Sequence, residues 1–86
     1  MQGTMESVKT SDLYHSAYLL SNGGKLEEIR IKGKDGRTVE FEFTGENVAK
    51  LTQEYILGEA TVNLRYLKSS LNHLRDIIFD KTRDRE

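Results

Sequence analysis

The sequence of 86 residues contains neither cysteine nor proline. Without cysteine the chain can form no disulfide framework and no cysteine-ligated metal site, which suits a reducing compartment such as the cytoplasm. Without proline it carries no rigid linker. No apolar run approaches the roughly 18 residues that a membrane-spanning helix needs, and the first residues do not resemble a signal peptide. We therefore expect a cytoplasmic protein with no membrane association.

Strong net charge is also missing, because 13 basic residues face 14 acidic ones and the formal charge is -1. This balance removes the general electrostatic argument for nucleic-acid binding, although a local basic stripe could still serve. The length supports one domain with a modest core. We expect a disordered segment at 1–9, a single α+β domain at 10–81 and a charged tail at 82–86.

The stretch Lys25–Thr44 predicts a β-hairpin, because apolar and charged residues alternate in two runs. Ile29 and Ile31 alternate with charged residues in the first run, and Val39, Phe41 and Phe43 alternate with Glu40 and Glu42 in the second. This pattern gives a sheet with one apolar face for the core and one solvated, charged face.

The loop length decides the pairing of the two strands. A two-residue Asp35-Gly36 loop would place Ile31 opposite Glu40 and so mix the faces. A three-residue loop, Lys34-Asp35-Gly36, keeps the faces separate and puts Gly36 at the left-handed position of a G1 bulge. The register that we predict pairs Ile31 with Val39, Arg30 with Glu40, and Ile29 with Phe41.

Three helices are expected around this hairpin. The first follows cap residues at 10–12 and ends at Asn22-Gly23-Gly24, with both glycines left-handed. The second runs over 46–57 from a Thr44 cap to Gly58, and the third runs over 64–81 from an Asn63 cap. Its leucine-rich seam fits either burial or self-association, and we favour burial on the hairpin; the seam comprises Leu64, Leu67, Leu71, Leu74 and Ile78. The predicted order is α-β-β-α-α, a two-stranded antiparallel hairpin packed against three helices.

Residues for catalysis are sparse. His15 is expected to be a solvated surface residue, because Leu13 and Ala17 form the apolar side of its helix. His73 and Asp76 lie three residues apart, but two ligands do not make a metal site. No serine stands in a nucleophile motif. We expect no enzymatic activity and no cofactor.

Two groups of residues are candidates for binding. Tyrosines often mark the margin of a core or an interface, and with two apolar positions of the third helix they give the interface candidates Tyr14, Tyr18, Tyr66, Leu71 and Ile78. The third helix also carries the basic stripe, which we define as Arg65, Lys68 and Arg75; it could track a phosphate backbone, pair with nearby glutamates or stay solvated.

Two stretches, 11–26 and 54–78, contain the motifs Ser11-Asp12-Leu13-Tyr14 and Tyr55-x-x-Gly58-Glu59-Ala60. With these motifs the chain resembles a family of small uncharacterised proteins of bacteria, phages and mobile elements. It differs at Gly24, where the family often has a bulky residue. The resemblance implies the fold and a bacterial or phage cytoplasmic setting, and it carries no catalytic residues to transfer.

These observations predict a non-enzymatic interaction module that self-associates, most simply as a homodimer, through a hairpin edge or the C-terminal helix. Edges of a small sheet are open to pairing with another chain. The alternative is a nucleic-acid-binding accessory protein of a phage or mobile element that uses the basic stripe.

Overall fold

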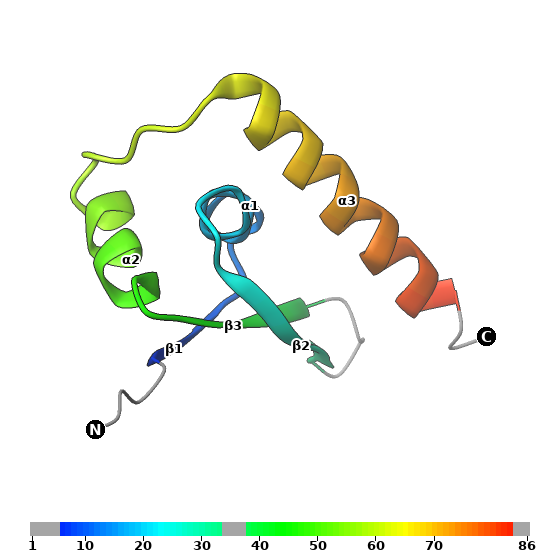
Figure 1. Cartoon of the computed structure of the whole chain (residues 1–86). Coiled ribbons are helices and arrows are strands. Elements are labelled where there is room, and N and C mark those ends of the chain that lie inside the picture. The colour runs from blue at the N-terminus through cyan, green and yellow to red at the C-terminus, as the bar shows by residue number, and fades with distance from the viewer. Residues whose placement is uncertain (1–5, 34–37, 84–86) are drawn as a thin grey trace.

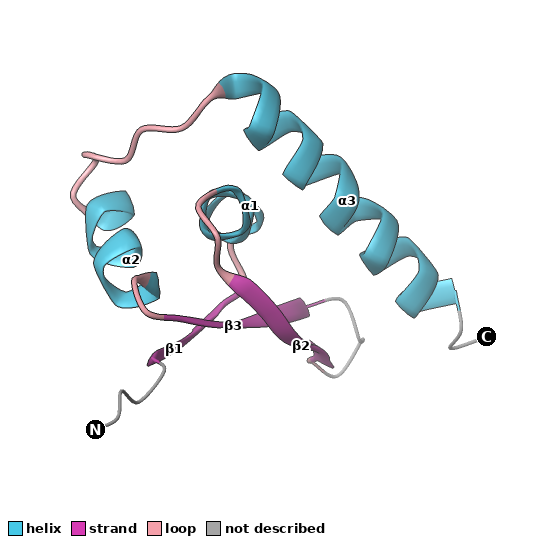
Figure 2. Cartoon of the chain, in the orientation of Figure 1, coloured by secondary structure: helices cyan, strands magenta, loops and turns pink. Residues whose placement is uncertain are grey.

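The structure is a computed structural model that describes residues 6–33 and 38–83. The elements follow the order β1 (Glu6–Thr10), α1 (Leu13–Ser21), β2 (Lys25–Lys32), β3 (Thr38–Gly45), α2 (Val48–Ile56) and α3 (Leu64–Arg83). The strands form an antiparallel sheet in the order β1-β3-β2. All three helices lie on one face of this sheet, with α1 between α2 and α3 (Figures 1 and 2). The α+β class is therefore confirmed.

The strand β1 corrects the predicted order. We expected residues 1–9 to lack regular structure and the sheet to have two strands. Instead, residues 6–10 pair with β3, and Val8 lies opposite Phe43. One apolar residue in Glu6–Lys9 is too weak a pattern to indicate a strand, but Val8 packs against the core once β3 is in place.

The hairpin register is confirmed. Ile31 pairs with Val39, Arg30 with Glu40, and Ile29 with Phe41. A bulge between Leu26 and Glu28 shifts the register once near the start of β2. The predicted turn residues, including Gly36, lie outside the described residues.

The helix α1 begins at an aspartate cap, because the Asp12 side chain accepts hydrogen bonds from the amides of Tyr14 and His15. It ends at Asn22, and Gly23 adopts the left-handed φ of 93°. Gly24 is not left-handed, contrary to our expectation. A Cβ at Gly24 would lie 2.9 Å from the carbonyl oxygen of Leu19, so this position needs glycine for space.

The other helices differ from the prediction at their ends. Because β3 continues to Gly45, α2 begins at Val48 after Asn47, and the Thr44 hydroxyl donates to Glu27 instead of capping the helix. Gly58, with φ 77°, follows α2 as expected. Asn63 caps α3 by accepting from the amides of Arg65 and Tyr66. The helix extends to Arg83, past the predicted end at 81.

The core lies between the sheet and the helices. Its fully buried apolar residues are Ala17, Leu19, Phe41, Phe43, Val48 and Leu74. The helix α3 contributes Leu74 and packs mainly on α1, with few contacts to the sheet. The seam is thus mostly buried within the domain, as we favoured, but it packs against α1 rather than the hairpin. Its first residue, Leu64, remains 79% exposed.

Replacing Leu74 with alanine should lower the free energy of unfolding by about 2–5 kcal/mol, because it leaves a cavity where α3 meets the core. Leu64→Ala on the same helix is the matched control and should change it by less than about 0.5 kcal/mol. Denaturant unfolding followed by circular dichroism measures both. Equal effects of the two changes would contradict this placement of α3.

Candidate functional site

Over the described ranges 6–33 and 38–83, no group of three histidine or acidic side chains could hold a metal ion. In the same part of the chain, no helix has the length and apolar character to cross a bilayer. The described residues carry two polar networks, one around His15 and one around Arg30, and a strand edge beside an apolar groove.

The first polar network surrounds His15, which is 6% exposed and not the solvated residue that we expected. Its Nδ1 lies 3.0 Å from the Thr10 hydroxyl, and its Nε2 lies 2.8 Å from the Thr52 hydroxyl. The ring stacks on Tyr55, with centroids 4.9 Å apart. His15 thus joins β1, α1 and α2, and both of its ring nitrogens are satisfied by the protein.

Asp12 and Tyr55 complete this network. The Tyr55 hydroxyl donates to the Asp12 carboxylate at 2.7 Å. Burial would raise the pKa of Asp12, but the hydrogen bonds from Tyr55 and the amides of His15 and Tyr14 lower it below its ordinary value. Burial and the bond to Asp12 raise the pKa of Tyr55 to about 12. These shifts follow from structural contacts that fix α2 to α1.

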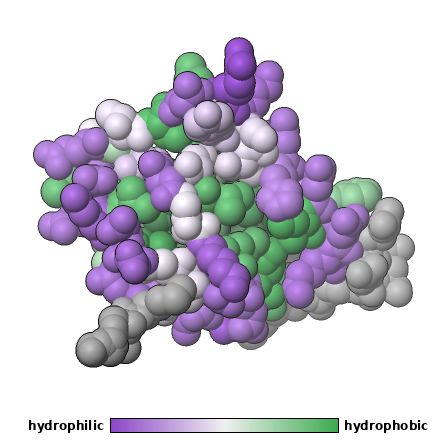
Figure 3. Space-filling model, viewed as in Figure 1, coloured by the Kyte–Doolittle hydropathy of each residue, from purple (hydrophilic) through white to green (hydrophobic). Residues whose placement is uncertain are grey.

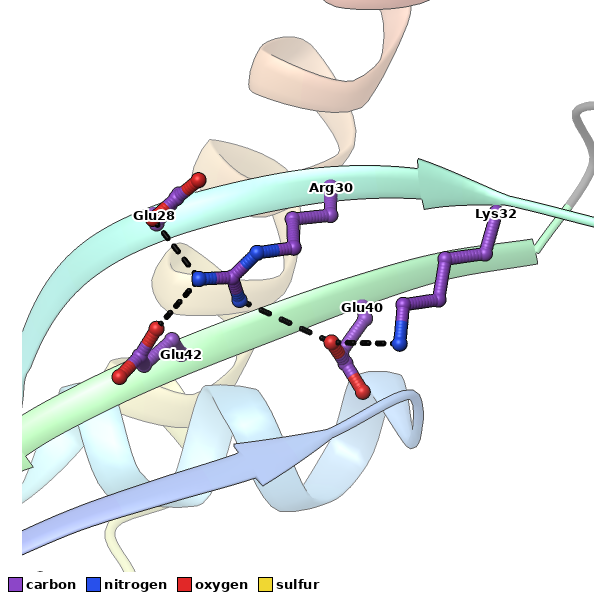
Figure 4. Close-up of polar contacts among 5 residues, drawn as sticks. All are labelled: Glu28, Arg30, Lys32, Glu40 and Glu42. Atoms are coloured by element: carbon purple, nitrogen blue, oxygen red, sulfur yellow. Dashed lines mark hydrogen bonds and ion pairs between the residues drawn. The ribbon is translucent and has the colours of Figure 1, made fainter.

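The open face of the sheet carries a second polar cluster centred on Arg30 (Figure 4). Its Nη2 donates to Glu28 at 2.8 Å and to Glu42 at 2.9 Å. Glu40 lies 3.7 Å from Nη1 and 3.1 Å from the Lys32 ammonium. The Glu40 and Glu42 side chains are only 18% and 20% exposed, so they are less solvated than we expected.

Arg30 has a special position in this cluster. The hydrogen bond to Glu42, with the charges of the three glutamates, raises the pKa of Arg30 above its ordinary value. Its Nη1 is buried without a hydrogen bond, because Glu40 is an ion-pair partner at a distance too long for one. The cluster holds β2 to β3 on the face that no helix covers.

The edge of β2 adjoins an apolar groove. Because α3 packs mainly on α1, the inward-facing Leu26, Ile29 and Ile31 of β2 are only half-buried. The β2–α3 groove has a volume of about 360 Å³ and is lined by Leu26, Glu27, Glu28, Ile29, Ile77 and Lys81. Figure 3 shows hydrophobic surface between β2 and the C-terminal half of α3. Among the described residues the outer edge of β2 has no strand partner, and its backbone lies beside the apolar side chains of the groove.

The opposite edge of the sheet is better protected. The strand β1 has five residues against eight in β2, and α2 packs against it. The Glu6 side chain also accepts from the Ala49 amide at 3.3 Å, which ties β1 to the first turn of α2. The two edges are therefore unequal, and β2 offers the longer and more accessible one.

The predicted interface residues differ in their exposure to solvent. Tyr14 and Tyr66 are 55% and 61% exposed. Tyr18 is 4% exposed and donates to Glu54, so it is far less accessible than these two tyrosines. Burial, with the Glu54 charge and hydrogen bond, raises the pKa of Tyr18. Leu71 and Ile78 are half-buried against the chain's own core.

The basic stripe of Arg65, Lys68 and Arg75 is exposed on α3. Among the residues that the structure describes, it forms no ion pair with Glu46, Glu54 or Glu59, the nearby glutamates that could have been its partners. Asp76 lies beside Arg75 in the sequence and reduces the positive charge of this face.

No family model, curated protein or solved structure matches the chain. The resemblance to a family of small bacterial and phage proteins therefore stays a prediction, and function has to be argued from the geometry alone.

Sequence reasoning missed the His15 network and the groove for different reasons. Asp12 and Tyr55 lie 43 residues apart in the sequence, so no local pattern indicates their contact. The groove results from α3 packing on α1, which the seam alone could not indicate. The pairing of Arg30 with Glu40, by contrast, followed directly from the register.

Acidification should destabilise the fold through His15. Burial, partly offset by the charge of Asp12, lowers the pKa of His15 below 6.5. A folded-state pKa below the unfolded one gives stability that is complete above the unfolded pKa and is lost as the pH falls through the folded one. The free energy of unfolding should therefore decrease between about pH 7.5 and about pH 5.5, and His15→Gln should reduce this decrease.

Chemical denaturation across this pH range measures the effect. This pH range lies above the range in which Asp12 affects stability. Because the pKa of Asp12 is lowered, the stability that Asp12 contributes stays complete until the pH falls toward 3.8. His73→Gln, at an exposed position on α3, is the matched control and should keep the decrease. An unchanged pH dependence in His15→Gln would refute the assignment.

Proposed function

We propose that this chain is a non-enzymatic interaction module that self-associates as a homodimer through the edge of β2. The observation that carries the proposal is the juxtaposition of this eight-residue edge, which has no strand partner among the described residues, with the β2–α3 groove. Backbone groups on a free edge supply directional hydrogen bonds, and adjacent apolar surface supplies the driving force of association.

The edge is favoured over the C-terminal helix as the site of association. The positions Leu67, Leu71, Leu74 and Ile78 of the seam already pack against the chain's own core. A coiled-coil dimer through them would have to remove this packing first. The β2 edge and its groove can accept a partner without unfolding any described element.

A second copy is favoured over an unrelated peptide because of the charges on β2. An antiparallel second copy of β2 can place its Glu28 opposite Arg30 of the first, and its Arg30 opposite Glu28, so that opposite charges meet twice. We also assign the module to a bacterial or phage cytoplasm, a setting that the absence of cysteine suits.

Light scattering coupled to gel filtration tests the proposal. At high protein concentration we expect a mass of about 20 kDa, twice the 9.9 kDa of one chain. Ile77→Lys should shift the molecule to a monomer, because it places a charge in the groove, whereas Leu64→Lys at the other end of α3 should not. Circular dichroism verifies that both variants are folded. A wild-type mass near 10 kDa at all concentrations would exclude self-association.

The exposure of the basic stripe, free of ion pairs among the described residues, supports nucleic-acid binding as a second candidate. If it binds a phosphate backbone, retention on DNA or RNA at low salt should weaken steeply with added salt and be lost in Arg65→Glu. Lys50→Glu, an exposed position on α2, should leave retention unchanged. Absence of retention at low salt would exclude this candidate.

A further inference from the structure

Resting on the proposed self-association, we infer a specific register: two copies of β2 pair antiparallel about a two-fold axis at Ile29, which joins both sheets into one of six strands. The inference follows from the alternation of the strand, its charges and the position of Ile29 in the groove.

Strand geometry limits the registers available. Successive residues of a strand direct their backbone N–H and C=O groups alternately to its two sides, so those facing the open edge recur at every second position. Opposed residues of an antiparallel pair must share a face. For two copies related by a two-fold axis, this requires the axis to lie between the two copies of the same residue, which then oppose each other. The bulge at Glu27 leaves Glu28–Lys32 as the regular part of β2.

The charges on the open face distinguish among these registers. An axis at Glu28 opposes two glutamates. An axis at Arg30 opposes Glu28 to Lys32 twice, but it also places two arginines directly opposite each other. An axis at Ile31 opposes Arg30 to Lys32 twice. An axis at Ile29 opposes Glu28 of each copy to Arg30 of the other, twice. Like charges directly opposite each other destabilise a sheet and opposite charges stabilise it. Ile29 is therefore the favoured centre.

The contacts already made by Arg30 are compatible with this arrangement. Its Nη2 is held between Glu28 and Glu42 of its own chain, and the Arg30 side chain is 32% exposed. The Glu28 side chain is 55% exposed, so it is accessible to a second Arg30. The two charge clusters would thus meet across the axis with alternating signs.

The apolar side of the strand supports the same centre. Ile29 lines the β2–α3 groove beside Ile77. With the axis at Ile29, the two isoleucines touch each other and the two grooves become continuous beneath the C-terminal halves of both α3 helices. Apolar surface that is half-exposed in one chain is then covered by its own copy.

Single cysteines test the register, because the natural chain has none. In Ile29→Cys the two thiols lie on the axis with Cα atoms about 4.5–5.5 Å apart, inside the range for a disulfide. Under mild oxidation it should form a covalent dimer about tenfold or more faster than Glu28→Cys, Arg30→Cys or Ile31→Cys alone. An equimolar mixture of Glu28→Cys and Arg30→Cys should form the mixed covalent dimer. This second experiment tests the same register while Ile29 stays in place.

The outcomes separate this inference from the proposed function. A dimer by light scattering that crosslinks fastest at Arg30→Cys, Glu28→Cys or Ile31→Cys alone would overturn the register and leave self-association standing. A dimer that crosslinks at none of the four positions, and not in the mixture, would place association on another surface. A wild-type monomer would remove the proposed function and the register together.

Discussion

The burial of α1 against the phenylalanines of β3 is the contact on which the remaining structure depends. Ala17 and Leu19 are fully buried together with Phe41 and Phe43. Because α1 lies above the middle of the sheet, α2 and α3 take places on its two sides (Figure 1). Ser16 tolerates this burial because its hydroxyl donates to the Asp12 carbonyl within the helix. The sheet and both flanking helices thus meet at one short helix.

The central position of α1 also explains why its pattern was misleading. A helix at a surface shows one apolar stripe, and this pattern predicts that His15 faces solvent. The structure covers α1 by the sheet and by α2 and α3, so five consecutive residues from His15 to Leu19 are buried. A histidine in such a helix needs polar partners, and Thr10 and Thr52 supply them from β1 and α2. Thr52 lies 37 residues from His15 along the chain, and local sequence periodicity does not indicate such a partner.

The hairpin could be predicted in more detail, since its information is local. Alternation fixed the facing sides of β2 and β3, and the requirement that opposed residues share a face gave the observed register. The strand β1 and the open edge of β2 could not be predicted in the same way. Val8 alone does not mark a strand. The outer edge of β2 depends on the strand order β1-β3-β2, and the groove beside it depends on α3 packing mainly on α1. The candidate site therefore arises from tertiary packing, and no motif in the sequence marks it.

The attachment of α3 has a dynamic consequence. The helix is joined to α2 by residues 57–63, which form no helix or strand, and it holds to the remaining structure mainly through α1. Local opening of α3 would expose one side of α1 but break no strand pairing. Its backbone amides should accordingly exchange with solvent deuterium as one cooperative unit, faster than those of β3, whose two neighbours protect it. The chain would then behave as a stable sheet-and-α1 unit carrying a detachable helix beside the β2 edge.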